Sequence, residues 1–399
     1  MKILFISTLN LATNPRFYKE IVLAKKNGFE VEVICFEFNN WSYDFNKELL
    51  QSLGETKIHL IPGNRKPFYP WAKSVFTETL FRKKAKWLKL KDRQLSQAVT
   101  RRSNLLIEYI NRLKGNYDLV IGHNPGALYP TRYAADKFGC RCGFDVEDYH
   151  PGEGDDKYLQ QLTKTLMNEY LPKMDYVTFA APLMKEMHTR DMGEEGEEWH
   201  VIMNFFPKDQ FVFSESDRSE PLQIVWFSQN VNYKRGLEQW IPALKYFEKE
   251  IELTLIGNKK EPFFSEYVEG NTFIKYVEPM KLEELNKHIC TNDVGLAIEG
   301  GKDYNNKISV PNKLITYYQA GLYILATDTP GQKEFMKSHP HSGMILSPAS
   351  EGFMDKLAQV IASKNSIRRT KRERFRNASV FNWERESEKL VEVWDAMKP

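Results

Sequence analysis

The chain has 399 residues, of which 42% are hydrophobic and 27% are charged, and its 56 Lys and Arg against 53 Asp and Glu give a net charge of +3. This composition is typical of a globular protein and excludes a disordered, collagen-like or disulfide-scaffold chain. At roughly 150 residues per domain, the length predicts two or three domains, and the strand pattern below favours two. The net charge is too small to indicate an acidic polymer as a partner, so local clusters have to carry any such attraction.

The first apolar run, residues 3–6, is short enough to be read either as part of a signal sequence or as a buried strand. Asn10 and Asn14 follow it closely and no small-residue cleavage site is present, so we interpret it as a strand. No apolar run approaches the roughly 18 to 20 residues that a membrane-spanning helix needs. The four cysteines are scattered, and Cys140 and Cys142 have no second ligand pair nearby, which indicates buried thiols in a reducing compartment rather than disulfides or a zinc site.

Short apolar runs bounded by turn residues alternate with helical segments along the chain. This alternation is typical of parallel sheets covered by helices on both faces, so we predict two doubly wound, Rossmann-like α/β domains separated by a polar linker at 214–221. The predicted boundaries are 1–205, 206–380 and a terminal helix at 381–399 that packs back on the N-terminal domain. The expected strands are 3–6, 31–36, 58–61, 119–121, 143–146, 176–180 and 201–203, then 222–227, 253–256, 273–277, 294–298, 323–327 and 344–346.

Residues 65–102 form a basic segment with bulky aromatics between its charges. It contains twelve Lys and Arg against two acids, Glu78 and Asp92, and its aromatics include Phe76 and Trp87. Such a stretch suits an anionic membrane surface, where rings enter the headgroup region and cations meet phosphates; a solvated helix whose aromatics pack on the domain is the alternative. No recognition motif for nucleic acid accompanies the charge, so nucleic acid is not predicted as a partner. We therefore expect a cytoplasmic protein, with peripheral attachment to the inner face of the membrane through this segment.

Polar residues follow several strands of the first half, at the edge where ligands of open parallel sheets gather. Asn14 and Arg16 lie at the start of a helix, which suits either an anion or a plain connection, and no G-x-G-x-x-G fingerprint is present. His123 lies in a tight Gly/Pro loop, where it is either a ligand-edge residue or a structural hydrogen-bonding group. The acidic run 145–150, which includes Asp148, suits a metal, a general base or a solvated loop, and we do not predict a metal.

The second half has polar groups and a cation at the equivalent edge. Ser228 and Asn230 end one strand, Arg235 precedes a helix, and Gly257 ends the following strand. Hydroxyl and amide groups, a cation and a helix N-terminus that arrive together suit a diphosphate.

The most specific pattern lies between residues 293 and 331. A strand ends in Glu299, a helix runs from Pro311-Asn312-Lys313-Leu314 to Ala320-Gly321, and Ala326-Thr327-Asp328 follows. This segment resembles the donor-binding segment of the GT-B glycosyltransferases, specifically the retaining family 4. The opening strand and loop, the run 118–123, the helix start at 235–238 and the Trp383-Glu384 helix occur in the family's order, so the resemblance extends over nearly the whole chain.

The resemblance implies two Rossmann-like domains that face each other across a cleft, with a nucleotide sugar bound mainly by the C-terminal domain. It also implies that Arg235 and Lys313 bind the diphosphate, and that His123 and Glu299 face the donor sugar. Two positions depart from the family pattern. Thr316 stands where a Glu usually holds the ribose hydroxyls, and a Gly-Arg pair is replaced around 228–230, which removes one phosphate-binding cation.

The predicted function is transfer of a sugar from a nucleoside-diphosphate sugar to a glycan or lipid-linked acceptor, with retention, in polysaccharide or glycolipid synthesis. No metal or cofactor is expected, because cations and helix N-termini neutralise the leaving diphosphate. A nucleotide-sugar epimerase or hydrolase of the same fold and a non-catalytic sugar-nucleotide-binding protein are the alternatives. The predicted site residues are His123 and Glu299 for catalysis, Ser228, Asn230, Arg235, Gly257, Asn312, Lys313 and Thr316 for the donor, and Asn14, Arg16 and Asp148 for the acceptor.

Overall fold

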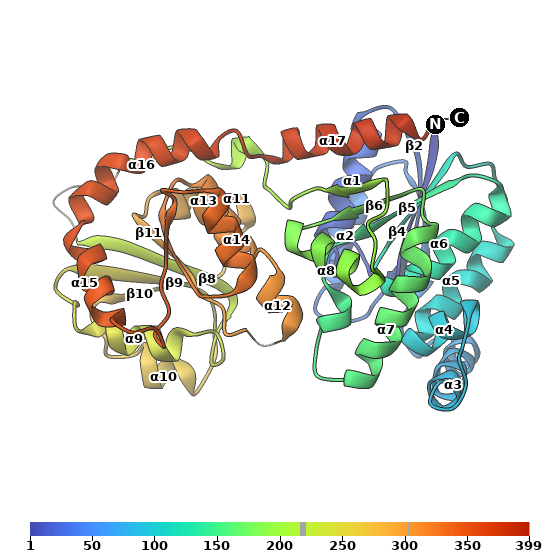
Figure 1. The fold of residues 1–399 in the computed structure, drawn as a ribbon, viewed down its shortest axis with the longest axis horizontal. Helices are drawn as coiled ribbons and strands as arrows, with labels where there is room; N and C mark the ends of the chain where they lie inside the picture. Colours follow the sequence, from blue (N-terminus) through green and yellow to red (C-terminus); the bar gives the residue numbers. More distant parts are fainter. Residues whose placement is uncertain (216–220, 302, 399) are drawn as a thin grey trace. The chain divides into compact units, whose positions relative to one another are not determined.

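The computed structural model describes residues 1–215, 221–301 and 303–398. The chain divides into two compact units, of which unit 1 comprises residues 1–203 and 387–399 and unit 2 comprises residues 204–386. Each unit is built on one sheet whose paired strands are all parallel, and helices lie on both faces of each sheet (Figure 1). The prediction of two doubly wound parallel-sheet α/β domains is therefore confirmed.

Unit 1 contains a seven-stranded sheet with the order β3-β2-β1-β4-β5-β6-β7. Because β2 and β4 flank β1, the winding direction reverses between β1 and β4, and ligands of doubly wound folds bind at such a switch point. The strands are β1 (Lys2–Ser7), β2 (Glu30–Glu37), β3 (Lys57–Pro62), β4 (Leu119–His123), β5 (Arg141–Val146), β6 (Tyr176–Phe179) and β7 (Trp199–Val201). The helices are α1 (Pro15–Lys26), α2 (Tyr43–Ser52), α3 (Phe68–Lys84), α4 (Asp92–Val99), α5 (Arg101–Arg112), α6 (Pro125–Phe138), η1 (His150–Gly152), α7 (Lys157–Tyr170), η2 (Leu171–Lys173), α8 (Pro182–Met192) and most of α17 (Trp383–Ala396).

Unit 2 contains a six-stranded sheet with the order β10-β9-β8-β11-β12-β13, and its switch point lies between β8 and β11. The strands are β8 (Leu222–Val231), β9 (Ile251–Lys259), β10 (Ile274–Val277), β11 (Val294–Ala297), β12 (Tyr323–Ala326) and β13 (Gly343–Ile345). The helices are η3 (Lys208–Gln210), α9 (Leu237–Lys245), α10 (Phe263–Tyr267), α11 (Leu282–Cys290), α12 (Tyr304–Ile308), α13 (Asn312–Gln319), α14 (Pro330–Ser338), α15 (Phe353–Ala362) and α16 (Lys364–Ala378).

The central strands are apolar on both faces, which is why they read as uninterrupted apolar runs. Ile3 to Ile6 of β1 are completely buried, and each such side chain contributes about 1.5–3 kcal/mol on burial. Trp394 of α17 closes the same core: its indole Nε1 donates to Tyr176 Oη at 2.9 Å, and its ring packs edge-on against Phe5 and Phe29. The C-terminal part of α17 therefore belongs to the core of unit 1.

The boundaries of the units differ from the predicted ones. The first boundary falls between Met203 and Asn204, two residues ahead of the predicted boundary at 205/206 and ahead of the polar linker at 214–221, of which residues 216–220 lie outside the described residues. Phe206 already belongs to unit 2, because its N–H donates to Gln319 Oε1 and its carbonyl accepts from Gln319 Nε2 and from the Trp383 N–H. At the second boundary, residues from Ser387 onward join unit 1, whereas the predicted terminal segment begins at 381.

Two strands of unit 2 continue through residues that the sequence predicts as strand-end turns. Beyond an irregularity between Phe227 and Asn230, β8 and β9 pair again at Asn230 with Asn258 and at Val231 with Lys259. Gly257 permits this pairing, because a Cβ at this position would lie 2.2 Å from the Ser228 carbonyl oxygen. Ser228, Asn230 and Gly257 thus lie in paired strands.

In the sheet of unit 1, strand β7 spans Trp199–Val201, whereas the sequence predicts a strand at 201–203.

The basic segment 65–102 consists of α3, α4 and the first residues of α5. In the part of the chain that the structure describes, no helix combines the length and the apolar character that a bilayer crossing requires.

Candidate active site

Asn124, at the carboxyl ends of the unit 1 strands, has a strained backbone. Its φ is +70°, which non-glycine residues rarely adopt and which costs on the order of 1–3 kcal/mol. Its side-chain oxygen accepts from Ser7 Oγ at 2.9 Å and from Asn14 Nδ2 at 3.4 Å, and its amide nitrogen donates to Glu147. Ser7 ends β1 and Asn124 follows β4, so the strain lies at the switch point. Strain that convergent polar groups maintain is characteristic of functional sites.

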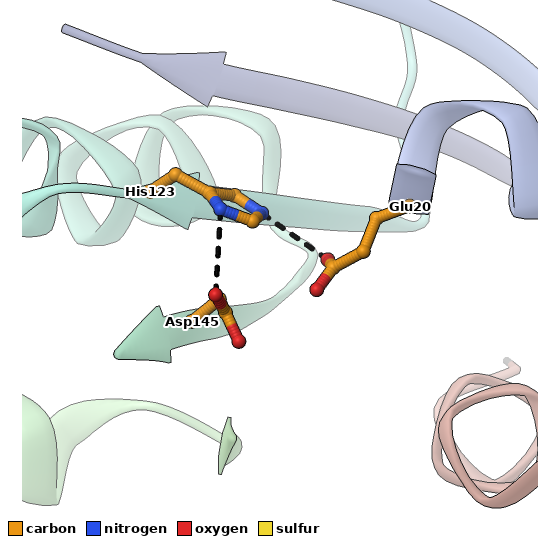
Figure 2. A group of neighbouring side chains, drawn as sticks. All are labelled: Glu20, His123 and Asp145. Atoms are coloured by element: carbon orange, nitrogen blue, oxygen red, sulfur yellow. Dashed lines mark hydrogen bonds and ion pairs between the residues drawn. The ribbon is translucent and has the colours of Figure 1, made fainter. Parts of the chain in front are cut away.

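Four charged side chains are buried beside this residue. Figure 2 shows the His123 ring between two carboxylates, with Nε2 3.1 Å from Glu20 Oε2 and Nδ1 3.5 Å from Asp145 Oδ2. Arg16 donates from Nε to Asp145 Oδ2 at 2.7 Å and from Nη1 to the Ile202 carbonyl at 2.7 Å, and its Nε lies 3.7 Å from Glu20 Oε1. Arg16, Glu20, His123 and Asp145 are at most 2% exposed. We call these four side chains the ion network of unit 1.

Burial and neighbouring charges shift the pKa values of these groups in different directions. Burial raises the pKa of Glu20. Burial acts in the same direction on Asp145, but the charges of Arg16 and His123 outweigh it and lower the Asp145 pKa. Burial would lower the pKa of His123, but Glu20 and Asp145 raise it overall. For Glu147, burial dominates and raises the pKa to about 7, so a carboxyl next to Asn124 can exchange a proton near neutral pH.

The ion network also has the composition of a metal site, because one ligand atom from each of Glu20, His123 and Asp145 lies within 4.8 Å of the others. The Arg16 guanidinium already supplies positive charge to both carboxylates. Buried charges are tolerated when they are paired, and these ion pairs form without a divalent ion, although Arg16 Nη2, Glu20 Oε1 and His123 Nδ1 are buried without a hydrogen-bond partner among the described residues. We therefore interpret the cluster as a network that fixes His123. This corrects the prediction that Arg16 is a cation of the acceptor loop, since its guanidinium turns into unit 1.

In unit 2, the structure brings Glu299 and Lys313 together at the carboxyl ends of the strands. Lys313 Nζ donates to Glu299 Oε1 at 2.8 Å and lies 5.4 Å from the centroid of the Trp226 ring of β8. The Glu299 N–H donates to Oγ1 of Thr327, the residue after β12, at 3.0 Å. Lys313 lies in the first turn of α13. The ends of β11 and β12, the middle of β8 and the start of α13 thus converge on this ion pair.

The loop that carries Arg235 lies against the same strand end. Gly236, the N-cap of α9, has φ +85° and packs against Ile298. A Cβ on Gly300 would lie 3.2 Å from the Lys234 carbonyl oxygen. Residues 234–236 therefore contact the residues that directly precede and follow Glu299 in the sequence. The N–H groups at the start of α9 add positive potential at this edge.

The other predicted site residues have varied positions. Asn312 is exposed, and its Oδ1 accepts from Asn204 Nδ2 at 3.2 Å. Thr316 is 1% exposed within α13, and Asn14 is the N-cap of α1, where it accepts from the Phe17 N–H at 2.9 Å. Asp148 follows β5, but Glu147 is the acidic residue that reaches Asn124.

Sequence reasoning missed Glu20, Asn124 and Glu147 as individual site residues. A signal for Glu20 does exist: Arg16 and Glu20 are four residues apart on a helix that also buries Phe17 and Ile21. A charged pair on an apolar helix face indicates a buried ion network. The positive φ of Asn124 had no such signal, because a residue before proline is expected in the extended region.

No protein-family model matches the chain, and no curated protein matches its sequence. Among solved structures, HepE of Anabaena in complex with UDP matches with a TM-score of 0.65 and 13% identity over 99% of this chain and 100% of HepE. Sucrose-phosphate synthase of Thermosynechococcus elongatus matches with a TM-score of 0.67 and 10% identity over 100% of this chain and 99% of that chain. A candidate UDP-N-acetylglucosamine 2-epimerase of Listeria monocytogenes matches with a TM-score of 0.56 and 11% identity over 98% of this chain and 94% of that chain. At these identities the likeness establishes the GT-B fold and leaves the substrates open.

Proposed function

We propose that this protein is a glycosyltransferase that moves a sugar from a nucleoside-diphosphate sugar to an acceptor hydroxyl with retention of configuration. The observation that carries this proposal is that the Lys313–Glu299 ion pair and the loop that carries Arg235 lie at one edge of unit 2. Cations and a helix start suit a diphosphate, and a carboxylate suits sugar hydroxyls. HepE, which has the same fold, was crystallised with UDP and with UDP-glucose, and this supports a nucleotide sugar as the donor.

In the proposed reaction, the bond between the anomeric carbon and the diphosphate oxygen breaks, and the acceptor oxygen bonds to that carbon on the same face. The acceptor proton passes to the departing phosphate oxygen. Arg235 and the start of α9 stabilise the charge on the diphosphate. The Lys313 ammonium has three N–H donors, so it can hold Glu299 and a phosphate oxygen together. These fixed positive groups perform the neutralisation that other enzymes assign to a metal, so we propose a metal-independent enzyme without a cofactor.

We propose that a glycan or lipid-linked acceptor, as used in polysaccharide or glycolipid synthesis, binds at the carboxyl edge of unit 1 beside Asn124 and Glu147. For His123 we propose a positioning role. Its two ring nitrogens face Glu20 and Asp145, and it directly precedes the strained Asn124. A direct contact of His123 with the donor sugar would require the ring to leave these carboxylates.

The donor site is tested first by thermal unfolding with UDP, GDP and ADP. A nucleotide present at 100 times its dissociation constant stabilises the folded protein by about 2.7 kcal/mol, so the matching nucleotide is expected to raise Tm by several degrees. Lys313→Met is expected to lose most of this shift. Lys337→Met, which removes an exposed lysine in the last turn of α14, is expected to keep it. Absence of a shift with all three nucleotides would contradict the donor site.

Turnover then separates the proposed function from its alternatives. A transferase releases free nucleotide from a panel of nucleotide sugars when an acceptor is present. An epimerase or hydrolase changes the donor without an acceptor, and the Listeria structure of the same fold keeps this alternative relevant. A non-catalytic binding protein shows the thermal shift without turnover, which is the alternative that Thr316 raises.

We further propose that the protein attaches, from the cytoplasm, to the inner face of the membrane through the surface of α3 and the residues that follow it. Tyr69 is 76%, Phe76 67% and Trp87 87% exposed, although large aromatic side chains are usually buried. Exposed Lys83, Lys84 and Lys86 lie between these rings in the sequence. Exposed rings among cations are complementary to an anionic lipid surface.

Sedimentation with vesicles tests this attachment. The protein is expected to pellet with vesicles that contain phosphatidylglycerol, less so as salt rises, and not with purely zwitterionic vesicles. The double variant Phe76→Ser/Trp87→Ser is expected to lose binding. Trp41→Ser removes a ring that is 73% exposed outside the segment and is expected to bind normally. Equal loss in both variants, or binding that ignores salt, would refute the proposed surface.

A further inference from the structure

Arg101 and Arg102 belong to the basic segment but do not lie on its exposed surface. Arg102 Nη1 donates to the carbonyl of Thr8, the residue after β1, at 3.0 Å, and its guanidinium lies 4.5 Å from the centroid of the Phe38 ring. Arg101 Nη2 donates to the carbonyl of Gly63, the residue after β3, at 2.7 Å. Both guanidinium groups therefore lie at the carboxyl edge of unit 1, where Asn124 also lies.

The charge of this arginine pair is incompletely balanced. Glu78 is the carboxylate that acts on both arginines, and it already pairs with Arg82 at 2.6 Å. Burial and, after it, the neighbouring Arg101 charge together lower the pKa of Arg102 to about 10. Within the described part of the chain, Arg101 Nη1 is buried and has no hydrogen-bond partner. A buried donor of a charged group without an acceptor is costly, so this arrangement favours the arrival of an anion.

The backbone adds positive potential at the same place. The twelve-residue helix α5 begins at Arg101 with Thr100 as its N-cap, and α6 begins at Pro125. Gly126 in the first turn of α6 has no room for a side chain, because its Cβ would lie 2.3 Å from Thr100 Cγ2 and 2.8 Å from Thr8 Cγ2. Two helix N-termini thus meet next to Thr8, whose carbonyl accepts a hydrogen bond from Arg102.

We infer that Arg101 and Arg102 bind a phosphoryl group of the acceptor, so that the acceptor is a phosphate-bearing sugar or sugar carrier. The identification of the ligand as an acceptor rests on the proposed function, whereas the phosphoryl-binding site itself does not. Guanidinium groups match phosphate oxygens in a two-pronged geometry, and Arg101 Nη1 has a donor free for this purpose. The phosphoryl group has two sources, a soluble sugar phosphate or a lipid-linked diphosphate, and both present the same oxygens.

Calorimetric titration of the full chain with inorganic phosphate, glucose 6-phosphate, geranyl diphosphate and uncharged glucose tests the inference. The wild type is expected to bind phosphorylated probes and not glucose. Arg101→Gln is expected to weaken that binding by about tenfold or more, and Arg101→Lys by less. Arg112→Gln, on the exposed end of the same helix, is the matched control and is expected to bind normally. Tighter binding of glucose 6-phosphate indicates a soluble acceptor, and tighter binding of geranyl diphosphate indicates a lipid carrier.

The nucleotide-induced thermal shift of unit 2 is measured on the same variants. Arg101→Gln is expected to keep it, which shows that the variant is folded and that its defect is confined to the phosphoryl site. The inference is overturned if the wild type binds no phosphorylated probe at millimolar concentration, or if Arg101→Gln and Arg112→Gln bind alike. Phosphate binding that persists in a protein without transferase activity supports the site and refutes the proposed function instead.

Discussion

Replacing Arg235 with alanine is expected to slow sugar transfer by about 100-fold or more while the protein stays folded. The residue precedes Gly236, the N-cap of α9, and its loop packs against the strand end that leads to Glu299. If the guanidinium contacts charge that develops on the leaving diphosphate, its loss removes stabilisation that is largest in the transition state. The measurement is the rate of nucleotide release with saturating donor and acceptor, reported as kcat and kcat/KM.

A matched arginine in the same unit serves as the control for this prediction. Arg376 is exposed on α16, where its neighbour Phe375 lies against Gly321 ahead of the start of β12, and Arg376→Ala is expected to leave turnover unchanged. Arg235→Lys keeps the charge but not the planar geometry, so it is expected to fall between the wild type and Arg235→Ala. Unchanged turnover in Arg235→Ala would remove this residue from the diphosphate site.

The parallel sheets could be predicted because their strands are apolar on both faces and are separated by polar turns. The extension of β8 and β9 beyond their expected ends could not be predicted in this way. Ser228 and Asn230 are typical turn residues, yet they continue a strand because Gly257 of the neighbouring strand lets the two backbones approach. Local composition does not contain that information, since the pairing depends on two segments far apart in the chain.

The two halves of the site differ in the same way. Glu299 and Lys313 were predicted from one continuous β-α-β segment, in which the fold of neighbouring elements brings them to 2.8 Å. The ion network instead combines α1, β4 and β5. Whether Arg16 faces solvent or the interior depends on Asp145, 129 residues further along, so the inward direction of its guanidinium could not be predicted from the loop in which it lies.

Removing the positive charge of Arg16 is expected to cause the largest loss of stability of any single change proposed for unit 1. In Arg16→Met the side chain keeps most of its volume, but Asp145 stays buried without its closest cation. Breaking a buried ion pair by deleting one partner costs about 3–5 kcal/mol. Chemical denaturation is expected to show this loss. Arg190→Met, which breaks an exposed pair with Glu186, is expected to cost less than about 1 kcal/mol.

A double variant and a change of pH distinguish the uncompensated charge from a packing defect. Arg16→Met/Asp145→Asn removes both partners, so it is expected to be more stable than Arg16→Met alone. The pKa of Asp145 is lowered in the folded protein, so its ionised form stabilises the fold above the unfolded pKa of about 3.9, and this contribution is lost as the pH falls through the folded value. Without Arg16 the pKa of Asp145 rises. Protonation of Asp145 therefore removes the unpaired buried charge at a higher pH in the variant than in the wild type. The stability gap between wild type and Arg16→Met is therefore expected to narrow from pH 7 to pH 4, whereas a gap caused by lost packing would stay constant.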